Sequence, residues 1–73
     1  REYLFSGRLE VDYLNEKYEL GLEEREEYET LAGLILYFNE SIPQEGDEVQ
    51  IGDVTFKILV VKNARIEEVK IML

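Results

Sequence analysis

Hydrophobic residues near the start of the chain form a short run and then take up a helical spacing. The run 3–5 ends at a serine and a glycine, which predicts a β-strand followed by a turn. Val11, Leu14 and Tyr18 recur three and four residues apart, and this spacing predicts a short helix from Val11 to about Tyr18. Gly21 follows, and we expect it to end this helix.

The clearest periodicity lies in the middle of the chain. Leu31, Leu34, Ile35 and Phe38 occupy positions i, i+3, i+4 and i+7, which is one face of an α-helix. Thr30 stands just before them, and its hydroxyl is the expected N-cap. The pattern therefore predicts a helix that packs this face against the rest of the domain.

Three further features bear on this helix. Gly33 lies inside it at a cost of about 1 kcal/mol relative to alanine, which indicates close backbone packing there, against the sheet. Pro43 disfavours α geometry in the residue before it, so we expect the helix to end at this point. Glu26, Glu27 and Glu29 just before the helix favour its positive N-terminal end.

From Glu48 onward the hydrophobic period changes to two. Residues 48–51 alternate between polar and apolar, and Gly52-Asp53 fits a two-residue hairpin turn. Residues 54–61 are β-branched and aromatic, which predicts a strand. A turn at 62–64 leads into a last strand over residues 65–73.

The last strand contains a break in its alternation. Val69, Ile71 and Leu73 share one face, whereas Ile66 falls on the other. A β-bulge near Glu67 would restore the register. Six elements in the order β-α-α-β-β-β then predict one domain over residues 1–73. Its expected fold is an α+β two-layer sandwich, with two helices on one face of an antiparallel sheet and the first strand at an edge or beside the last strand.

Composition narrows the functions that such a domain can perform. The net charge is −9, and residues 10–29 hold nine acidic side chains against Lys17 and Arg25. Nucleic acid and anionic lipid surfaces are therefore unsuitable partners. No apolar run approaches the length of a membrane span, so direct membrane insertion is not expected. Because the chain opens on Arg1 and its pattern runs to its end, we expect a piece excised from a longer protein, as its last domain.

The sequence offers no catalytic residues. It lacks cysteine and histidine, which excludes thiol nucleophiles, disulfides and the commonest general base. The weak metal candidates are Glu23, Glu24, Glu26 and Glu27, which could collect Mg²⁺ or Ca²⁺; a solvated acidic loop is the preferred interpretation. Five tyrosines could stack on an adenine or flavin ring, although tyrosines more often line the margin of a thin core.

Several short motifs occur in one order along residues 6–73. They are Gly7-Arg8-Leu9, Val11-Asp12-Tyr13-Leu14-Asn15, the run Tyr28, Thr30, Leu31, Ala32, Gly33 and Leu34, the turn Ile42, Pro43, Gly46 and Asp47, the strand Phe56-Lys57-Ile58-Leu59, and Arg65-Ile66 followed by Val69. Together they resemble the CorC/HlyC transporter-associated domain. Such domains lie at the C-terminus of bacterial proteins that are similar to magnesium and cobalt efflux proteins and are often labelled hemolysin-like.

The resemblance implies a context that composition alone does not provide. It implies a non-catalytic domain at the cytoplasmic face of the bacterial inner membrane, where it modulates ion transport. Its partners would be a CBS pair and a membrane domain of the same chain, and a homodimer stays open. The family fold is similar to part of a FAD-binding fold, so FAD or another adenine nucleotide is the alternative ligand, and no other cofactor is expected. A divalent-cation sensor that uses residues 22–28, the acidic connection between the two helices, is the third hypothesis.

Overall fold

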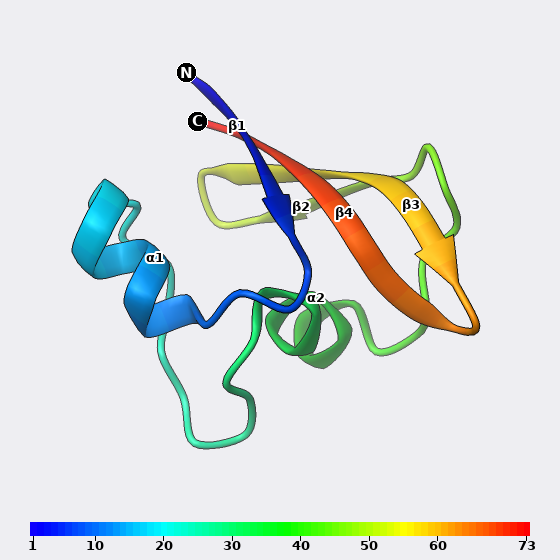
Figure 1. Cartoon of the computed structure of the whole chain (residues 1–73), viewed down its shortest axis with the longest axis horizontal. Helices are drawn as coiled ribbons and strands as arrows, with labels where there is room; N and C mark the ends of the chain where they lie inside the picture. Colours follow the sequence, from blue (N-terminus) through cyan, green and yellow to red (C-terminus); the bar gives the residue numbers. More distant parts are fainter.

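Four antiparallel strands form one sheet in the order β1-β4-β3-β2, and two helices cover one of its faces (Figure 1). The computed structural model describes all residues, 1–73. The elements are β1 (Glu2–Ser6), α1 (Val11–Tyr18), α2 (Leu31–Asn39), β2 (Glu48–Ile51), β3 (Val54–Lys62) and β4 (Arg65–Met72). The predicted α+β sandwich and its element order are confirmed, and β1 lies at an edge beside the last strand.

The two ends of the chain lie next to each other. β1 pairs with β4 in a register that sets Glu2 opposite Met72 and Phe5 opposite Val69. The N–H of Leu73 donates to the carbonyl of Arg1 over 2.9 Å, and Figure 1 shows both termini at the same corner of the sheet. Neither helix is long and apolar enough to cross a bilayer.

The core lies between the helices and the inner face of the sheet. Leu31, Leu34 and Ile35 of α2 are almost completely buried, as predicted, and Leu14 of α1 is buried with them. Phe38 agrees with the prediction only in part, because its side chain is partly buried at the margin of the core. The strands contribute Phe5, Val49, Phe56, Ile58, Ile66, Val69 and Ile71 to the same cluster. Leu73 stands outside it and is exposed.

Two compensating irregularities bring the core residues of β3 and β4 onto one face. Ile58 pairs with Val69 and Val60 with Glu68, which leaves Leu59 as an extra residue on β3. Val61 then pairs with Ile66, which leaves Glu67 as an extra residue on β4. The predicted bulge near Glu67 is confirmed, and it is why Ile66 is buried together with Val69.

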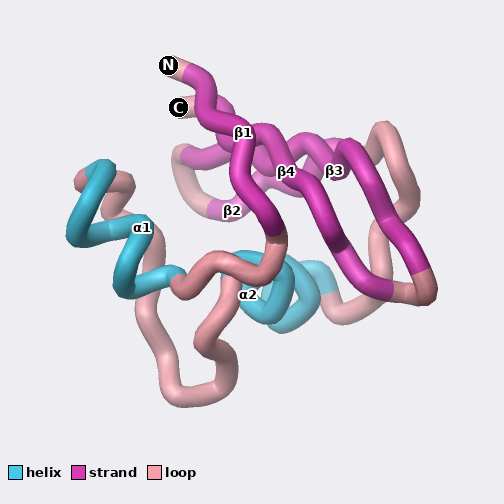
Figure 2. Tube along the Cα trace, viewed as in Figure 1, coloured by secondary structure: helices cyan, strands magenta, loops and turns pink.

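The bounds of α1 match the prediction, but the residues that end the two helices differ from those expected. α1 ends at Glu19, which adopts left-handed geometry with φ 55° and donates its N–H to the carbonyl of Asn15. α2 ends in the same way at Glu40, with φ 65°. Gly21 and Pro43 were therefore the wrong stop signals, because a glutamate one position beyond each helix already turns the chain. Figure 2 shows the long loop that follows α1.

Candidate functional site

Gly7, in the loop after β1, touches two other elements through its backbone. Its N–H donates to the carbonyl of the bulged Glu67 over 2.9 Å, and its own carbonyl accepts from the N–H of Ala32 over 2.9 Å. A Cβ at this position would lie 2.1 Å from the carbonyl oxygen of Ile66. Only glycine fits this contact, so Gly7 joins the β4 bulge to the start of α2.

The first turn of α2 is fully capped by the protein itself. The N–H groups of Leu31 and Ala32 donate to the carbonyls of Leu9 and Gly7, both over 2.9 Å. The N–H of Gly33 donates to the Oγ1 of Thr30 over 3.1 Å, which confirms the predicted N-cap. A helix binds phosphate through free N–H groups at this end. The first three residues of α2 have no free backbone N–H group, so this helix end offers no binding site for the diphosphate of FAD.

The N-terminus of α1 is equally unsuited to an anion. The N–H of Val11 donates to the carbonyl of Glu29 over 2.9 Å. Glu10 and Asp12 place carboxylates on either side of it, and they line the same hollow of the surface. A phosphate group brought to this helix end would meet negative charge, and the geometry therefore gives no support to nucleotide binding.

Gly33 is closely packed, although its neighbour is not the one predicted. A Cβ at Gly33 would lie 3.0 Å from the Cβ of Tyr28 and 3.3 Å from the Oγ1 of Thr30. The expectation of close approach is confirmed, and the expectation that the sheet is the partner is wrong. The side chain of Tyr28 folds back over the first turn of α2 and occupies the space beside Gly33.

Asn15 anchors the connection between the helices, and the periodicity gave no sign of this role. Its Nδ2 donates to the carbonyl of Leu22 over 2.7 Å, and its Oδ1 accepts from the N–H of Leu22 over 2.8 Å. The same Nδ2 donates to Glu24 over 2.8 Å. One side chain thus holds both backbone groups of Leu22, which fixes the start of the acidic connection.

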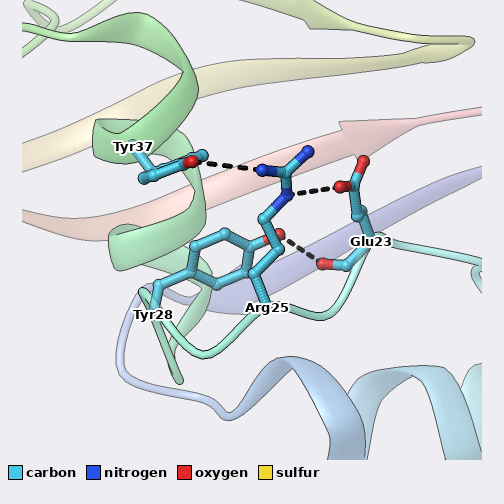
Figure 3. Close-up of polar contacts among 4 residues, drawn as sticks. All are labelled: Glu23, Arg25, Tyr28 and Tyr37. Atoms are coloured by element: carbon cyan, nitrogen blue, oxygen red, sulfur yellow. Dashed lines mark hydrogen bonds and ion pairs between the residues drawn. The ribbon is translucent and has the colours of Figure 1, made fainter.

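The acidic connection is also held from its far end by an aromatic and cationic cluster (Figure 3). Arg25 pairs with Glu23 and donates to the phenol oxygen of Tyr37 over 3.1 Å. Its guanidinium lies 5.3 Å from the Tyr37 ring centroid and 5.4 Å from that of Phe38. The phenol of Tyr28 donates to the backbone carbonyl of Glu23. The connection is therefore packed on α2.

Two ionisable groups of this cluster have shifted pKa values. The hydrogen bond to Glu23 raises the pKa of Arg25, so its positive charge is maintained at any physiological pH. Burial is the main cause of the raised pKa of Tyr28, and the negative charge of Glu23 adds to it. Both residues keep the protonated form in which they donate their hydrogen bonds.

The four weak metal candidates do not form a cluster. Glu23 faces Arg25, and Glu24 accepts from Asn15. A hollow of about 400 Å³ brings Glu24 and Glu26 near Glu10, Asp12 and Glu29, while Glu23 and Glu27 lie outside its lining. No three carboxylates of the chain come close enough to hold one metal ion.

The turn before β2 is a second structural motif. The N–H of Gly46 donates to the carbonyl of Ile58 over 2.7 Å, and the N–H of Ile58 donates to the carbonyl of Asp47 over 2.9 Å. The carboxylate of Asp47 accepts from the N–H of Gln44 over 2.8 Å. Pro43 is buried and Ile42 is exposed. This turn therefore fastens the chain to the middle of β3.

A larger groove of about 860 Å³ lies between the loop after α1, the end of α2 and the β2–β3 hairpin. Nine of its sixteen lining residues are hydrophobic, and the charged ones are all acidic. The hydrophobic ones are Leu20, Leu22, Leu34, Phe38, Val49, Ile51, Val54, Phe56 and Leu73. The sequence could not reveal this groove, because it assembles residues from separate segments, 20–23, 34–39 and 48–56, together with Leu73.

Three of the five tyrosines lie in the core or at its margin, as the preferred interpretation predicted. Tyr28 is buried, and Tyr3 and Tyr18 pack partly against the core with ring centroids 5.5 Å apart. Tyr13 and Tyr37 are exposed at the surface. Tyr37 nevertheless packs its ring against those of Tyr28 and Phe38.

Comparison with known proteins places these features in a family. The sequence model of the transporter-associated domain, CorC_HlyC, matches residues 1–73. The UPF0053 protein YegH of Escherichia coli is 37% identical over 67 residues, which are 92% of this chain and 13% of that protein. The chain thus spans about an eighth of the length of that relative.

Solved structures have the same fold. A functionally unknown conserved protein from Haemophilus influenzae is 30% identical, with a TM-score of 0.88 over 97% of this chain and 86% of that one. A CorC_HlyC domain from a Xylella fastidiosa hemolysin, solved in complex with Mg²⁺ and Mn²⁺, is 28% identical, with a TM-score of 0.80 over 97% of this chain and 85% of that one.

Proposed function

The chain belongs to the CorC_HlyC transporter-associated domain family, and from this premise we propose that it is a non-catalytic regulatory module of an ion-transport protein. The protein that carries it would be a magnesium or cobalt efflux protein or a hemolysin-like membrane protein. The module would lie at the cytoplasmic face of the bacterial inner membrane. There it would contact the CBS pair and the membrane domain of its own chain.

The observation that carries the proposal is the use to which the family-like residues are put. Gly7 and Ala32 join α2 to the β4 bulge, Thr30 caps α2, Asn15 fastens the connection, and Asp47 shapes the turn. Each of these residues makes contacts that maintain the fold, and none directs a reactive group into a cleft. A domain whose shared residues maintain a shape acts through its surface, which favours an interaction module over an enzyme.

The size of the domain relative to its relatives supports the same reading. The chain spans 13% of YegH, so most of such a protein lies outside this domain. A module attached to a larger transporter changes transport only by contacting the states of that transporter unequally. The domain therefore needs a contact surface and no active site.

Deletion of the domain tests the proposal. Residues 1–73 are removed from the full-length protein that carries them, and Mg²⁺ or Co²⁺ efflux from vesicles is measured at matched protein levels. Membrane insertion should persist, because it depends on apolar spans elsewhere. The efflux rate or its response to nucleotide should change. Unchanged flux with an unchanged nucleotide response would remove the regulatory function and leave a role in assembly or stability.

Divalent-cation binding is the second candidate, favoured by the Xylella fastidiosa relative that was solved with Mg²⁺ and Mn²⁺. The negative charge of the hollow beside α1 would attract a cation to this surface, where no three carboxylates are close enough to bind one ion together. A ligand that binds the native state raises its stability by mass action. Titration of Mg²⁺ or Mn²⁺ against the melting temperature decides this candidate, because a flat response at millimolar metal eliminates it.

A further inference from the structure

We propose that the apolar groove, together with the free edge of β2, binds an extended segment with alternating apolar side chains and flanking lysines or arginines. The segment would come from another part of the protein that carries this domain. This inference rests on the proposed function, because it names the contact through which the module acts.

The floor and walls of the groove set the apolar part of the ligand. Leu34 and Phe56 form a nearly fully buried floor, and Leu22 is 7% exposed. Phe38 and Leu73 stand at the rim, where Leu73 exposes 45% of its surface. Covering half-exposed hydrophobic side chains is favourable by roughly 25 cal/mol per Å² of apolar surface. A ligand whose apolar side chains insert between these walls therefore gains binding free energy from the apolar surface that it covers.

The position of β2 sets the backbone geometry of the ligand. β2 is an outer strand of the sheet and has only β3 as a neighbour. An outer strand presents unpaired backbone groups to which an added strand can bind. Side chains of an added strand alternate between the two faces of the sheet. Every second one would therefore enter the groove on the helix-covered side, beside Val49 and Ile51.

The acidic lining of the groove indicates which residues should stand at the two ends of the bound segment. The charge of the chain also argues against self-association. The charged residues that line the groove are Glu23, Glu48 and Asp53, with no lysine or arginine among the lining residues. Basic side chains at the ends of a bound segment would therefore be attracted. A second copy of this chain carries a net charge of −9 and would be repelled.

The chain length outside this domain provides a source for the segment. The 13% coverage of YegH means that a relative of that size holds most of its sequence beyond these residues. An intramolecular segment binds at the high effective concentration that tethering gives. Even a short strand with weak intrinsic affinity would then occupy the groove.

A peptide titration followed by NMR of the 73-residue domain tests the proposal. The probe contains three valines that alternate with two threonines, with two lysines at each end; a second probe replaces the lysines with glutamates. The lysine probe should shift the amide signals of residues 48–51 and the side-chain signals of Leu22 and Phe38. The glutamate probe should cause no shifts, and Leu4 on the open face of the sheet should be unaffected.

Charge reversal separates groove binding from general attraction to an acidic protein. Glu48→Lys with Asp53→Lys should weaken the lysine probe at least tenfold. The control, Glu26→Lys with Glu27→Lys, makes the same charge change outside the groove and should weaken it less than twofold. Equal losses in both variants, shifts confined to the acidic hollow, or concentration-dependent shifts of residues 48–51 without peptide would each overturn the proposal.

The outcome is distinguishable from failure of the proposed function. No binding of the lysine probe, with a changed efflux after domain deletion, would overturn the groove as the contact and retain the regulatory module. Binding of the probe at residues 48–51, with unchanged efflux after deletion, would retain the groove and remove the regulatory function.

Discussion

The carbonyl oxygen of Gly7 accepts a 2.9 Å hydrogen bond from the N–H of Ala32, and this bond ties the loop after β1 to the first turn of α2. On its other side Gly7 donates to the bulged Glu67 of β4. Three elements that are far apart in sequence therefore meet at one residue without a side chain.

Gly7→Ala should be the most damaging small substitution in this domain. The added Cβ would lie 2.1 Å from the carbonyl oxygen of Ile66, so the backbone must move. We expect a loss of about 3 kcal/mol in the free energy of unfolding, at the upper end for overpacking. Urea denaturation measures it. Gly21→Ala is the control, because nothing lies within 4 Å of its Cβ and only its φ of 73° is strained. Equal losses in the two variants would refute the contact.

Thr30→Ala should cost about 1 kcal/mol, because the N–H of Gly33 loses the side-chain acceptor that caps α2. Thr30→Ser keeps the hydroxyl and should retain most of the stability. Thermal melts of the two variants provide the comparison. If serine proves as costly as alanine, the threonine contributes through its methyl group and the cap is energetically unimportant.

Ala64→Gly should stabilise the domain by roughly 0.5–1 kcal/mol, because an L-residue in left-handed geometry is strained and glycine is not. Ala64 has φ 61° in the turn between β3 and β4, where Asn63 has φ 52°. Asn63→Gly is the matched control and should gain less, since asparagine tolerates this region. A lower melting temperature for Ala64→Gly would show that the strain at this turn is negligible.

Stability should fall in alkaline solution through Tyr28. Burial raises the pKa of this phenol above its ordinary value of about 10, so the folded state favours the neutral form. The stabilisation is complete below about pH 10 and is lost as the pH rises toward the folded-state value, because the unfolded chain releases its proton first. Tyr28→Phe should make the free energy of unfolding less dependent on pH above 10. Tyr3→Phe, which removes a hydroxyl outside this cluster, should keep the parent's dependence.

Replacing Glu23, Glu24, Glu26 and Glu27 with glutamine should leave the fold intact. Glu23 pairs with Arg25 on an exposed surface, and exposed pairs contribute little. Relief of the net charge of −9 should keep the melting temperature level or raise it slightly in low salt. Circular dichroism checks this expectation. A marked loss of helix signal would mean that the acidic connection depends on its charges.

The sequence predicted what depends on local pattern. The bounds of α1, the Thr30 cap and the bulge at Glu67 follow from spacing, propensity and alternation over a few residues. The helix stops at Glu19 and Glu40 were missed because glutamate gives no signal for left-handed geometry.

Contacts between distant parts of the chain were beyond the reach of pattern. Gly7 contacts Ile66, although most of the sequence separates the two residues. The local spacing of hydrophobic residues gives no sign of such a contact. Asn15 bonds a residue seven positions away, in a loop without regular structure. For the candidate site, the separate loop glutamates could be counted in advance, whereas the groove depends on how the loop, α2 and the hairpin come together.

The pairing of the two chain ends determines how the domain responds to a pulling force. Arg1 and Leu73 lie on neighbouring antiparallel strands, so tension between them loads the hydrogen bonds of β1 and β4 one after another instead of all at once. A strand that is peeled in this way separates at low force. Gly7 follows directly on β1, so its link to α2 would carry the load next, and the cap of α2 would loosen while β4 still pairs with β3.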